Sequence, residues 1–352
     1  MKISFRRFKR PVAGTATIAA LTLGLVAAAL PLSLPASAQS PSKSCADSLT
    51  SSPTGPATVS ASSSPFGRVL VIGSGDYAGC SLYLLTSDQF HALSGAPFAC
   101  SDNTNALGLS CDTVLWPALL TEGAPIAGPG INPELLGTVT RTDVPISGVS
   151  SVQQVTYAGQ PLYRFFLDEV PGETEGANLF DPVTSPTGIW YRVEPGRGRP
   201  APGQADMLLE TSPVGGTGPD KTVLAATMNN DFSLFPRASF PVYTLSSEDR
   251  DDQGRQSDQE SACQRQCSLY WPPVLTSTRP EAGPGVDQDA LGIIVRPDGT
   301  RQVTYHGKPL YLFVNDAYIK GLPYGGARID GAGAHTPWGV FNTISPSSRD
   351  SV

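Results

Sequence analysis

The stretch QVTYHGKPLYLFVND, at residues 302–316, decides the fold of this chain. A near copy, QVTYAGQPLYRFFLD, occupies residues 154–168. In each copy an X-Gly pair, His306-Gly307 or Ala158-Gly159, separates two runs of residues that favour strands. Because glycine accepts the positive φ of a primed two-residue turn, each copy predicts a β-hairpin.

The proline of the second strand is compatible with this hairpin. A two-residue loop places Tyr305 opposite Lys308 as a hydrogen-bonded pair, so Thr304 and Pro309 form the next, non-hydrogen-bonded pair. A proline in that position does not interrupt the ladder to its hairpin partner.

The second strand predicts burial on both of its faces. Side chains alternate along a strand, so one face carries Tyr311 and Phe313. The other face carries Leu310, Leu312 and Val314. Both faces are apolar, which is typical of a strand inside a sandwich or barrel.

The hairpin belongs to a larger repeated unit. Equivalent residues before the hairpin are 155 positions apart, as Trp116 and Trp271 are. From the hairpin onward the separation is 148 residues, as between Tyr163 and Tyr311 and between Trp190 and Trp338. Seven extra residues near 144–151 explain the change in offset. We therefore predict two homologous units, at residues 65–195 and 221–346. A Pro/Gly-rich linker at 196–220 joins them, and residues 347–352 form a tail.

Each unit consists of two halves with the same order of elements. A first strand is followed by a strand that contains the motif tyrosine, then by a loop, and then by a strand that begins with Trp. The fold class is therefore all-β, with two tandem antiparallel sandwich-like or barrel-like domains, each built from two pseudo-repeat halves. The alternative is a four-bladed β-propeller in which each half is one blade.

The repeated hairpins resemble a bacterial family of secreted proteins and lipoproteins that is described as a secreted repeat of unknown function. The resemblance rests on a Yx(F/W/Y)xxD motif, present in full at Tyr163 and Tyr311 and as half-copies at Tyr83 and Tyr243. The motif residues are Tyr83, Asp88, Tyr163, Phe165, Asp168, Tyr243, Glu248, Tyr311, Phe313 and Asp316. The resemblance implies no known reaction. Four occurrences favour an architectural role over a binding role, because an active site rarely needs four copies.

The amino terminus predicts export. Residues 1–38 combine a basic start, an apolar run and a small-residue cleavage site at Ala36-Ser37-Ala38, which is typical of a signal peptide. The first cysteine, Cys45, lacks the apolar lipobox residue before it. We therefore predict a secreted protein without a lipid anchor. No other apolar run is long enough to span a bilayer.

Composition limits the partners. The formal net charge is -7 and becomes more negative once the basic leader is removed, which argues against nucleic acid or an anionic membrane as a partner. Residues 39–64 are rich in Ser, Pro and Ala and have few large apolar side chains. This composition predicts a flexible segment before the first unit.

The cysteines follow the leader and are even in number, which in an exported chain predicts three disulfides out of 15 connectivities. The six residues are Cys45, Cys80, Cys100, Cys111, Cys263 and Cys267. Nearness in sequence and the repeat favour Cys100 with Cys111 and Cys263 with Cys267. Cys45 then pairs with Cys80.

One acidic stretch has the spacing of a calcium loop. Asp249, Asp251, Gln253 and Glu260 fall at positions 1, 3, 5 and 12 of an EF-hand pattern, although an amide replaces the usual residue at position 5. A solvated acidic loop is the preferred interpretation. Calcium is the one cofactor that the sequence suggests.

The sequence offers no convincing catalytic residue. His91, His306 and His335 have no metal-ligand spacing, and no nucleophile elbow or phosphate loop is present. The first hypothesis is a non-enzymatic extracellular binding or cell-envelope interaction module of unknown ligand. The alternatives are a calcium-dependent accessory protein and a secreted hydrolase that uses loop carboxylates.

Overall fold

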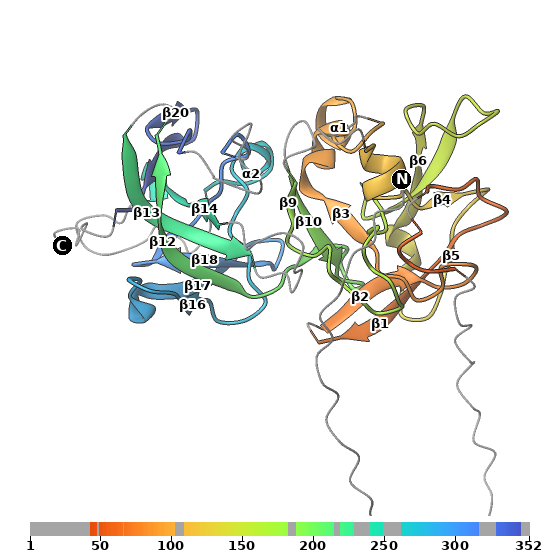
Figure 1. The fold of residues 1–352 in the computed structure, drawn as a ribbon, viewed down its shortest axis with the longest axis horizontal. Coiled ribbons are helices and arrows are strands. Elements are labelled where there is room, and N and C mark those ends of the chain that lie inside the picture. The colour runs from red at the N-terminus through yellow and green to blue at the C-terminus, as the bar shows by residue number, and fades with distance from the viewer. Residues whose placement is uncertain are drawn as a thin grey trace, which may run out of the picture. The chain divides into compact units, whose positions relative to one another are not determined.

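The computed structural model describes residues 43–47, 49–65, 67–102, 109–181, 188–214, 219–228, 239–248, 262–316 and 329–345. Strands dominate these residues and the helices are short (Figure 1), so the all-β prediction is confirmed. The described strands form six small sheets, and none of these closes on itself. The sheets occur as three pairs, one member in each repeat.

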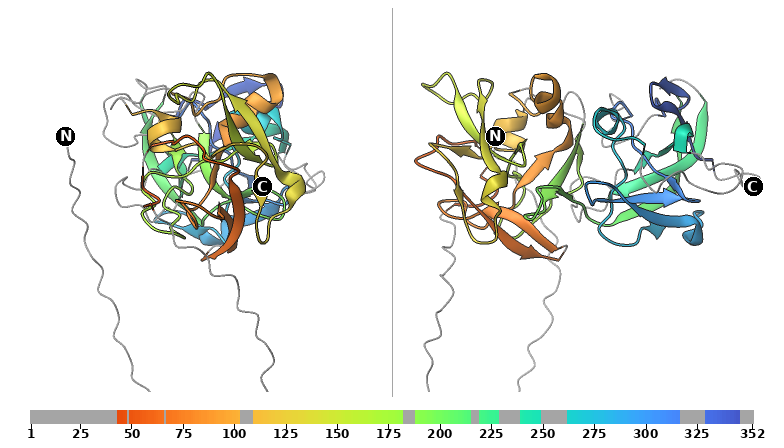
Figure 2. Two further views of the ribbon diagram at one scale, coloured as in Figure 1. Left: turned by 90° about the vertical axis from the view of Figure 1, so that its right-hand side faces the viewer. Right: turned by 180° about the vertical axis from the view of Figure 1, so that it is seen from behind.

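The first pair of sheets is built on a long hairpin. In the first repeat the strands are β1 (Thr58–Ser64), β2 (Gly67–Ile72) and β5 (Ile126–Ala127). In the second repeat they are β12 (Ala205–Pro213), β13 (Asp220–Met228), β14 (Ser239–Pro241) and β16 (Glu281–Ala282). In both, the first strand pairs antiparallel with the second and parallel with a two-residue strand from an Ala-Gly-Pro-Gly loop. Figure 2 shows the β1–β2 hairpin in orange from behind.

The second pair of sheets contains the half-motif tyrosines. Its first-repeat strands are β3 (Tyr83–Leu85), β9 (Phe180–Asp181), β10 (Gly188–Val193) and β11 (Pro200–Ala201). Its second-repeat strands are β15 (Tyr243–Leu245), β20 (Ala334–Thr336) and β21 (Gly339–Thr343). Leu85 pairs with Trp190, and Leu245 pairs with Phe341. Phe341, and not Trp338, is therefore the counterpart of Trp190, because the two connections between hairpin and last strand differ in length.

The third pair of sheets contains the repeated hairpins. Its first-repeat strands are β4 (Leu120–Thr121), β6 (Leu136–Arg141), β7 (Val152–Tyr157) and β8 (Gln160–Pro161). Its second-repeat strands are β17 (Leu291–Val295), β18 (Arg301–Tyr305) and β19 (Lys308–Pro309). The short helices lie between strands: η1 (Thr86–Asp88), α1 (Gln89–Ser94), η2 (Cys111–Leu115), η3 (Pro133–Leu135), η4 (Ser246–Glu248), α2 (Gln266–Tyr270) and η5 (Gln288–Ala290).

The predicted hairpin register is confirmed. Tyr305 pairs with Lys308 and Thr304 pairs with Pro309. His306 has a φ of 48° and Gly307 a φ of 78°, which are the two positive values of a type I′ turn. The first-repeat turn at Ala158-Gly159 has nearly the same values, so one turn type sets both registers.

The predicted alternation of faces is also confirmed. Leu310 and Leu312 belong to one buried cluster, whereas Tyr311 and Phe313 belong to another. Regular pairing nevertheless ends at Pro309. Beyond it, Tyr311 bridges to Tyr243 and to Pro273, which come from two other segments. The hairpin thus links separate sheets of its repeat.

Two segments that composition assigned to a flexible stretch and to a linker contain strands. Residues 39–64 include β1, whose Val59 is fully buried, and Cys45, which bonds to Cys80. The segment 196–220 includes β12, a nine-residue strand. Strand β1 has few large side chains and lies beside the apolar strand β2, whereas β12 contributes Met207 to the core and pairs with β13.

All six cysteines are paired in the arrangement that sequence spacing favours. The disulfides are Cys45–Cys80, Cys100–Cys111 and Cys263–Cys267, with sequence separations of 35, 11 and 4 residues. In the chain-entropy model a disulfide stabilises more when it closes a longer loop of the unfolded chain. The three bonds should therefore differ in their contributions to stability.

We expect the Cys45→Ser/Cys80→Ser variant to lose about 4 kcal/mol of unfolding free energy, and Cys263→Ser/Cys267→Ser to lose about 2 kcal/mol. Urea titrations of the oxidised proteins measure both values. The reduced wild type serves as the reference for complete loss. A larger loss for the short loop would show that native-state packing, and not loop closure, governs these bonds.

Candidate functional site

The tyrosine of each motif copy hydrogen-bonds to the carboxyl group of the other copy in the same repeat, and not to the carboxyl group of its own copy. The Tyr83 hydroxyl donates to Asp168 Oδ2 at 2.7 Å. The Tyr163 hydroxyl donates to Asp88 Oδ2, also at 2.7 Å. Tyr83 and Asp88 belong to the half-copy, whereas the other two residues belong to the full copy. Each half therefore supplies the partner of the other.

The second repeat forms the same crossed pairs. The Tyr243 hydroxyl donates to Asp316 Oδ2 at 2.5 Å, and the Tyr311 hydroxyl donates to Glu248 Oε1 at 2.6 Å. Glutamate thus fills the place that aspartate has in the first repeat. The replacement of aspartate by Glu248 in this half-copy therefore keeps the hydrogen bond to the tyrosine of the other half.

The paired tyrosines are also neighbours in the backbone ladder. Tyr83 and Tyr163 exchange two N–H to carbonyl bonds of 2.9 and 3.0 Å, and Tyr243 and Tyr311 exchange bonds of 2.8 and 2.9 Å. An exchange of both bonds places the two tyrosines directly opposite each other. The halves therefore join at the first residue of each motif.

The carboxyl groups of the motifs also hold loops. Asp168 accepts from the Glu175 N–H at 2.9 Å, and Asp316 accepts from the Asp330 N–H at 2.8 Å. Asp88 accepts from the Ala99 N–H at 2.8 Å. These bonds tie the loop that follows each motif to the core.

The aromatic position of the motif packs on a tryptophan stack. In the first repeat Trp116 lies parallel to Trp190, with ring centroids 3.8 Å apart, and Phe165 lies 4.4 Å from Trp116. In the second repeat Trp271 stacks on Phe341 at 3.7 Å, and Phe313 lies 4.3 Å from Trp271. The motif tyrosines Tyr83 and Tyr243 meet these tryptophans edge-on. The stack and the crossed bonds form one buried assembly.

Burial makes these carboxyl groups weak acids. Desolvation raises the pKa of Asp168 well above its ordinary value and raises the pKa values of Asp88 and Glu248. It raises the pKa of Asp316 to about 7, while the bond from Tyr243 opposes the shift. The folded protein therefore binds protons more tightly at these groups than the unfolded chain does.

This shift predicts that stability falls as pH rises. A carboxyl group with a raised folded-state pKa favours the folded state fully below its unfolded pKa, about 4, and that contribution is lost as pH rises through about 7. Asp316→Asn cannot ionise, so its unfolding free energy should depend less on pH between 5 and 8. Urea titrations across this range test the difference. The exposed Asp220→Asn is the control, and an unchanged slope in Asp316→Asn would contradict the assignment.

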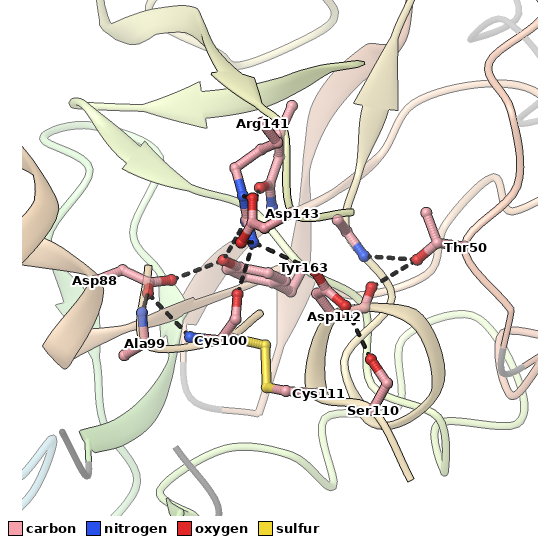
Figure 3. The surroundings of a disulfide bond; sticks show 12 residues. Thr50, Asp88, Ala99, Cys100, Ser110, Cys111, Asp112, Arg141, Asp143 and Tyr163 are labelled. Atoms are coloured by element: carbon pink, nitrogen blue, oxygen red, sulfur yellow. Dashed lines mark hydrogen bonds and ion pairs between the residues drawn. A yellow bond between two sulfur atoms is a disulfide. The ribbon is translucent and has the colours of Figure 1, made fainter. Parts of the chain in front are cut away.

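A buried arginine lies beside the first repeat's crossed pairs. The Arg141 side chain is fully buried and forms two 2.7 Å bonds to the carboxylate of Asp143. It also donates to the Tyr163 hydroxyl at 3.1 Å and forms an ion pair with Asp112 at 3.3 Å. Figure 3 shows the guanidinium between these groups, next to the Cys100–Cys111 disulfide. The two carboxylates balance the buried positive charge.

The arginine also ties a disulfide loop to the hairpin. Arg141 donates to the Cys100 carbonyl at 2.7 Å and to Gln154 Oε1 at 2.5 Å. In the second repeat Arg296 donates to the Cys263 carbonyl at 2.9 Å and to Gln302 Oε1 at 2.7 Å. The same arginine, glutamine and cysteine carbonyl thus meet in both repeats.

The charge balance of the two arginines differs. Cys267 lies at the sequence position that corresponds to Asp112 of the first repeat. Asp298 corresponds to Asp143 but accepts from Thr300 in its own turn, at 2.8 Å from the N–H and 2.6 Å from the hydroxyl. The two positions that supply carboxylates to Arg141 in the first repeat therefore do not do so in the same way in the second.

Sequence reasoning missed these arginines and glutamines. The signal was present, because Arg141 and Arg296 are separated by the same 155 residues as the tryptophans, and Gln154 and Gln302 by the same 148 residues as the hairpins. A search for polar residues that recur at the repeat offset, in strands of otherwise apolar character, would have found them.

We expect Arg141→Met to destabilise the protein by about 3–5 kcal/mol, because it leaves the buried carboxyl group of Asp112 and the partly exposed one of Asp143 without their cation. Urea titration at pH 7 measures the loss. Adding Asp112→Asn should recover part of it, since that carboxyl, whose pKa burial raises to about 7, would no longer ionise. Arg301→Met, at an exposed arginine, is the matched control. An equal loss in the control would rule out the charge argument.

The calcium hypothesis lies outside the described residues. Asp249, Asp251, Gln253 and Glu260 all fall in the gap at 249–261, so the hypothesis stays a prediction. Among the residues that the structure does describe, no group of three His, Cys, Asp or Glu side chains could hold a metal ion. His91, His306 and His335 lie on different elements: α1, the β18–β19 turn and β20.

Comparison with known proteins finds a family match over the second hairpin. Residues 292–321 match a family described as a secreted repeat of unknown function. The matched stretch begins in β17 and includes the full motif from Tyr311 to Asp316. No curated protein and no solved structure matches the chain. Within the described residues, no helix is long and apolar enough to cross a membrane.

Proposed function

We propose that the protein is a secreted, non-enzymatic binding module for an extracellular or cell-envelope ligand. The observation that carries this proposal is that the recurrent carboxyl groups of the motif are buried and bonded within the protein. Asp88, Asp168 and Asp316 each bond a tyrosine hydroxyl and a backbone N–H, and each is at most 1% exposed. Groups held in this way serve the architecture of the repeat.

The outer surface of the second hairpin sheet is the best candidate for ligand contact. A groove of about 410 Å³ lies over β17 and β18. Its size falls within the range of small-molecule binding sites in proteins, about 300–1,000 Å³. Most of its lining residues, from Gly292 onward, lie within the stretch that matches the secreted repeat family.

The disulfides and the similarity to secreted repeats support action outside the cell. Three disulfides persist in an oxidising compartment. The signal-like residues 1–38 agree with this location. The net charge of -7 favours neutral or cationic ligands over anionic polymers.

Binding to envelope material tests this proposal. We expect the oxidised chain of residues 39–352 to co-sediment with bacterial envelope fractions and to be recovered unchanged, with no soluble fragments released from them. The reduced and alkylated chain is the control for non-specific adsorption. Equal sedimentation of both forms, or no sedimentation of either, would contradict a binding role. Release of sugar or peptide fragments would instead support the hydrolase alternative.

A further inference from the structure

The groove over β17 and β18 has a floor made by a glycine and a threonine. Gly292 pairs with Thr304 across the two strands. Both residues lie on the face opposite Leu291 and Val303, which belong to the buried core. A Cβ atom added to Gly292 would lie only 2.7 Å from Thr304 Oγ1. The glycine therefore keeps the floor open, as glycine in a strand does where a ligand approaches the backbone.

Thr304 is a largely buried residue whose side chain lines this groove. Thr304 is 3% exposed, and among the described residues its hydroxyl has no hydrogen-bonding partner. A hydroxyl can donate one hydrogen bond and accept two. Because Thr304 lines the groove and its hydroxyl bonds no other described group of the protein, this hydroxyl is available to a ligand that enters the groove.

Two exposed polar side chains line the edge of the groove. Asp289 comes from η5, where its N–H donates to Asp287 Oδ1 at 2.9 Å. His306 comes from the β18–β19 turn and is held there by an N–H bond of 2.8 Å to the Ala290 carbonyl. The groove thus combines a carboxylate, an imidazole and a hydroxyl around a floor without a side chain.

The same residue types recur in the first repeat. Gly137 pairs with Thr156, which is 6% exposed and, within the described residues, also has no hydrogen-bonding partner for its hydroxyl. A Cβ atom at Gly137 would lie 3.1 Å from Thr156 Oγ1. Glu134 corresponds to Asp289 and is held in the same way, by an N–H bond of 3.1 Å to Asn132. Ala158 stands in place of His306, so the acid, the glycine and the threonine are the shared set.

These groups have the chemistry to bind sugar hydroxyls. The carboxylate accepts hydrogen bonds, the threonine hydroxyl accepts and donates, and Ile294 offers an apolar surface to the C–H face of a ring. The acidic edge and the net charge of -7 disfavour an anionic ligand. We propose that the Gly292–Thr304 groove, and its counterpart at Gly137–Thr156, bind neutral hydroxylated sugar units of an extracellular glycan. The inference rests on the proposed binding function and specifies its ligand class.

Removal of the hydroxyls without a change of shape tests the inference. Thr304→Val and Thr156→Val are nearly isosteric, and the hydroxyls they remove bond no described group of the protein. The probe is the set of glycan strands from bacterial cell-wall sacculi, freed of protein and stem peptides, with a neutral secreted polysaccharide as a second sugar source. We expect the double variant to bind the responsive glycan about tenfold more weakly or worse. Each single variant should be intermediate, and Tm should not change.

The outcomes separate this inference from the proposed function. Thr211→Val, at an exposed threonine of the β12–β13 hairpin whose hydroxyl bonds Thr222, is the control and should bind as the wild type does. If the wild type sediments with envelope fractions but both glycans fail to bind, or if the double variant binds equally well, the sugar site is overturned and the binding module stands. Binding to the released stem peptides alone would also overturn it. A lowered Tm in the double variant would assign the hydroxyls a structural role. If the wild type binds no envelope fraction, both proposals fall.

Discussion

The structure depends on the exchange of tyrosine and carboxyl partners between the two halves of each repeat. A carboxyl group buried without partners would be strongly destabilising. Asp168 obtains its tyrosine from the other half, and Asp88 does the same in reverse. One half alone would leave these groups unsatisfied, so the pair of halves is the smallest unit that meets its own hydrogen-bonding needs.

Local patterns in the sequence predicted the features that depend on local physics. The X-Gly turn fixes the register at Tyr305 because two consecutive positive φ values select one turn type. The burial of Arg141 could not be read in this way, because its partners lie at residues 100, 112, 143, 154 and 163 and meet only in the folded chain. Strand β1 could not be predicted from its own composition, which resembles that of a linker, because it is a strand through its pairing with β2.

The two repeats show which parts of the unit tolerate change. The guanidinium of Arg141 has two carboxylates beside it, whereas the positions that correspond to them in the second repeat hold Cys267 and an aspartate turned toward Thr300. The bond from each arginine to a disulfide carbonyl is nevertheless present in both. The constraint common to the repeats is therefore the attachment of the cysteine loop to the hairpin, and the residues at the two carboxylate positions can vary.

The hairpin packs one face of β18 into the core, and part of its other face lines the groove. Its inward residues, such as Val303, pack in the core, while Thr304 lies one residue away on the outer face. A strand allows this division because its side chains alternate at every residue. The outer pair of glycine and threonine is present in both repeats even though the core does not require a hydroxyl there. In the second repeat this hydroxyl lines a groove and has no partner among the described residues, and this is the reason for proposing a ligand contact there and not a packing role.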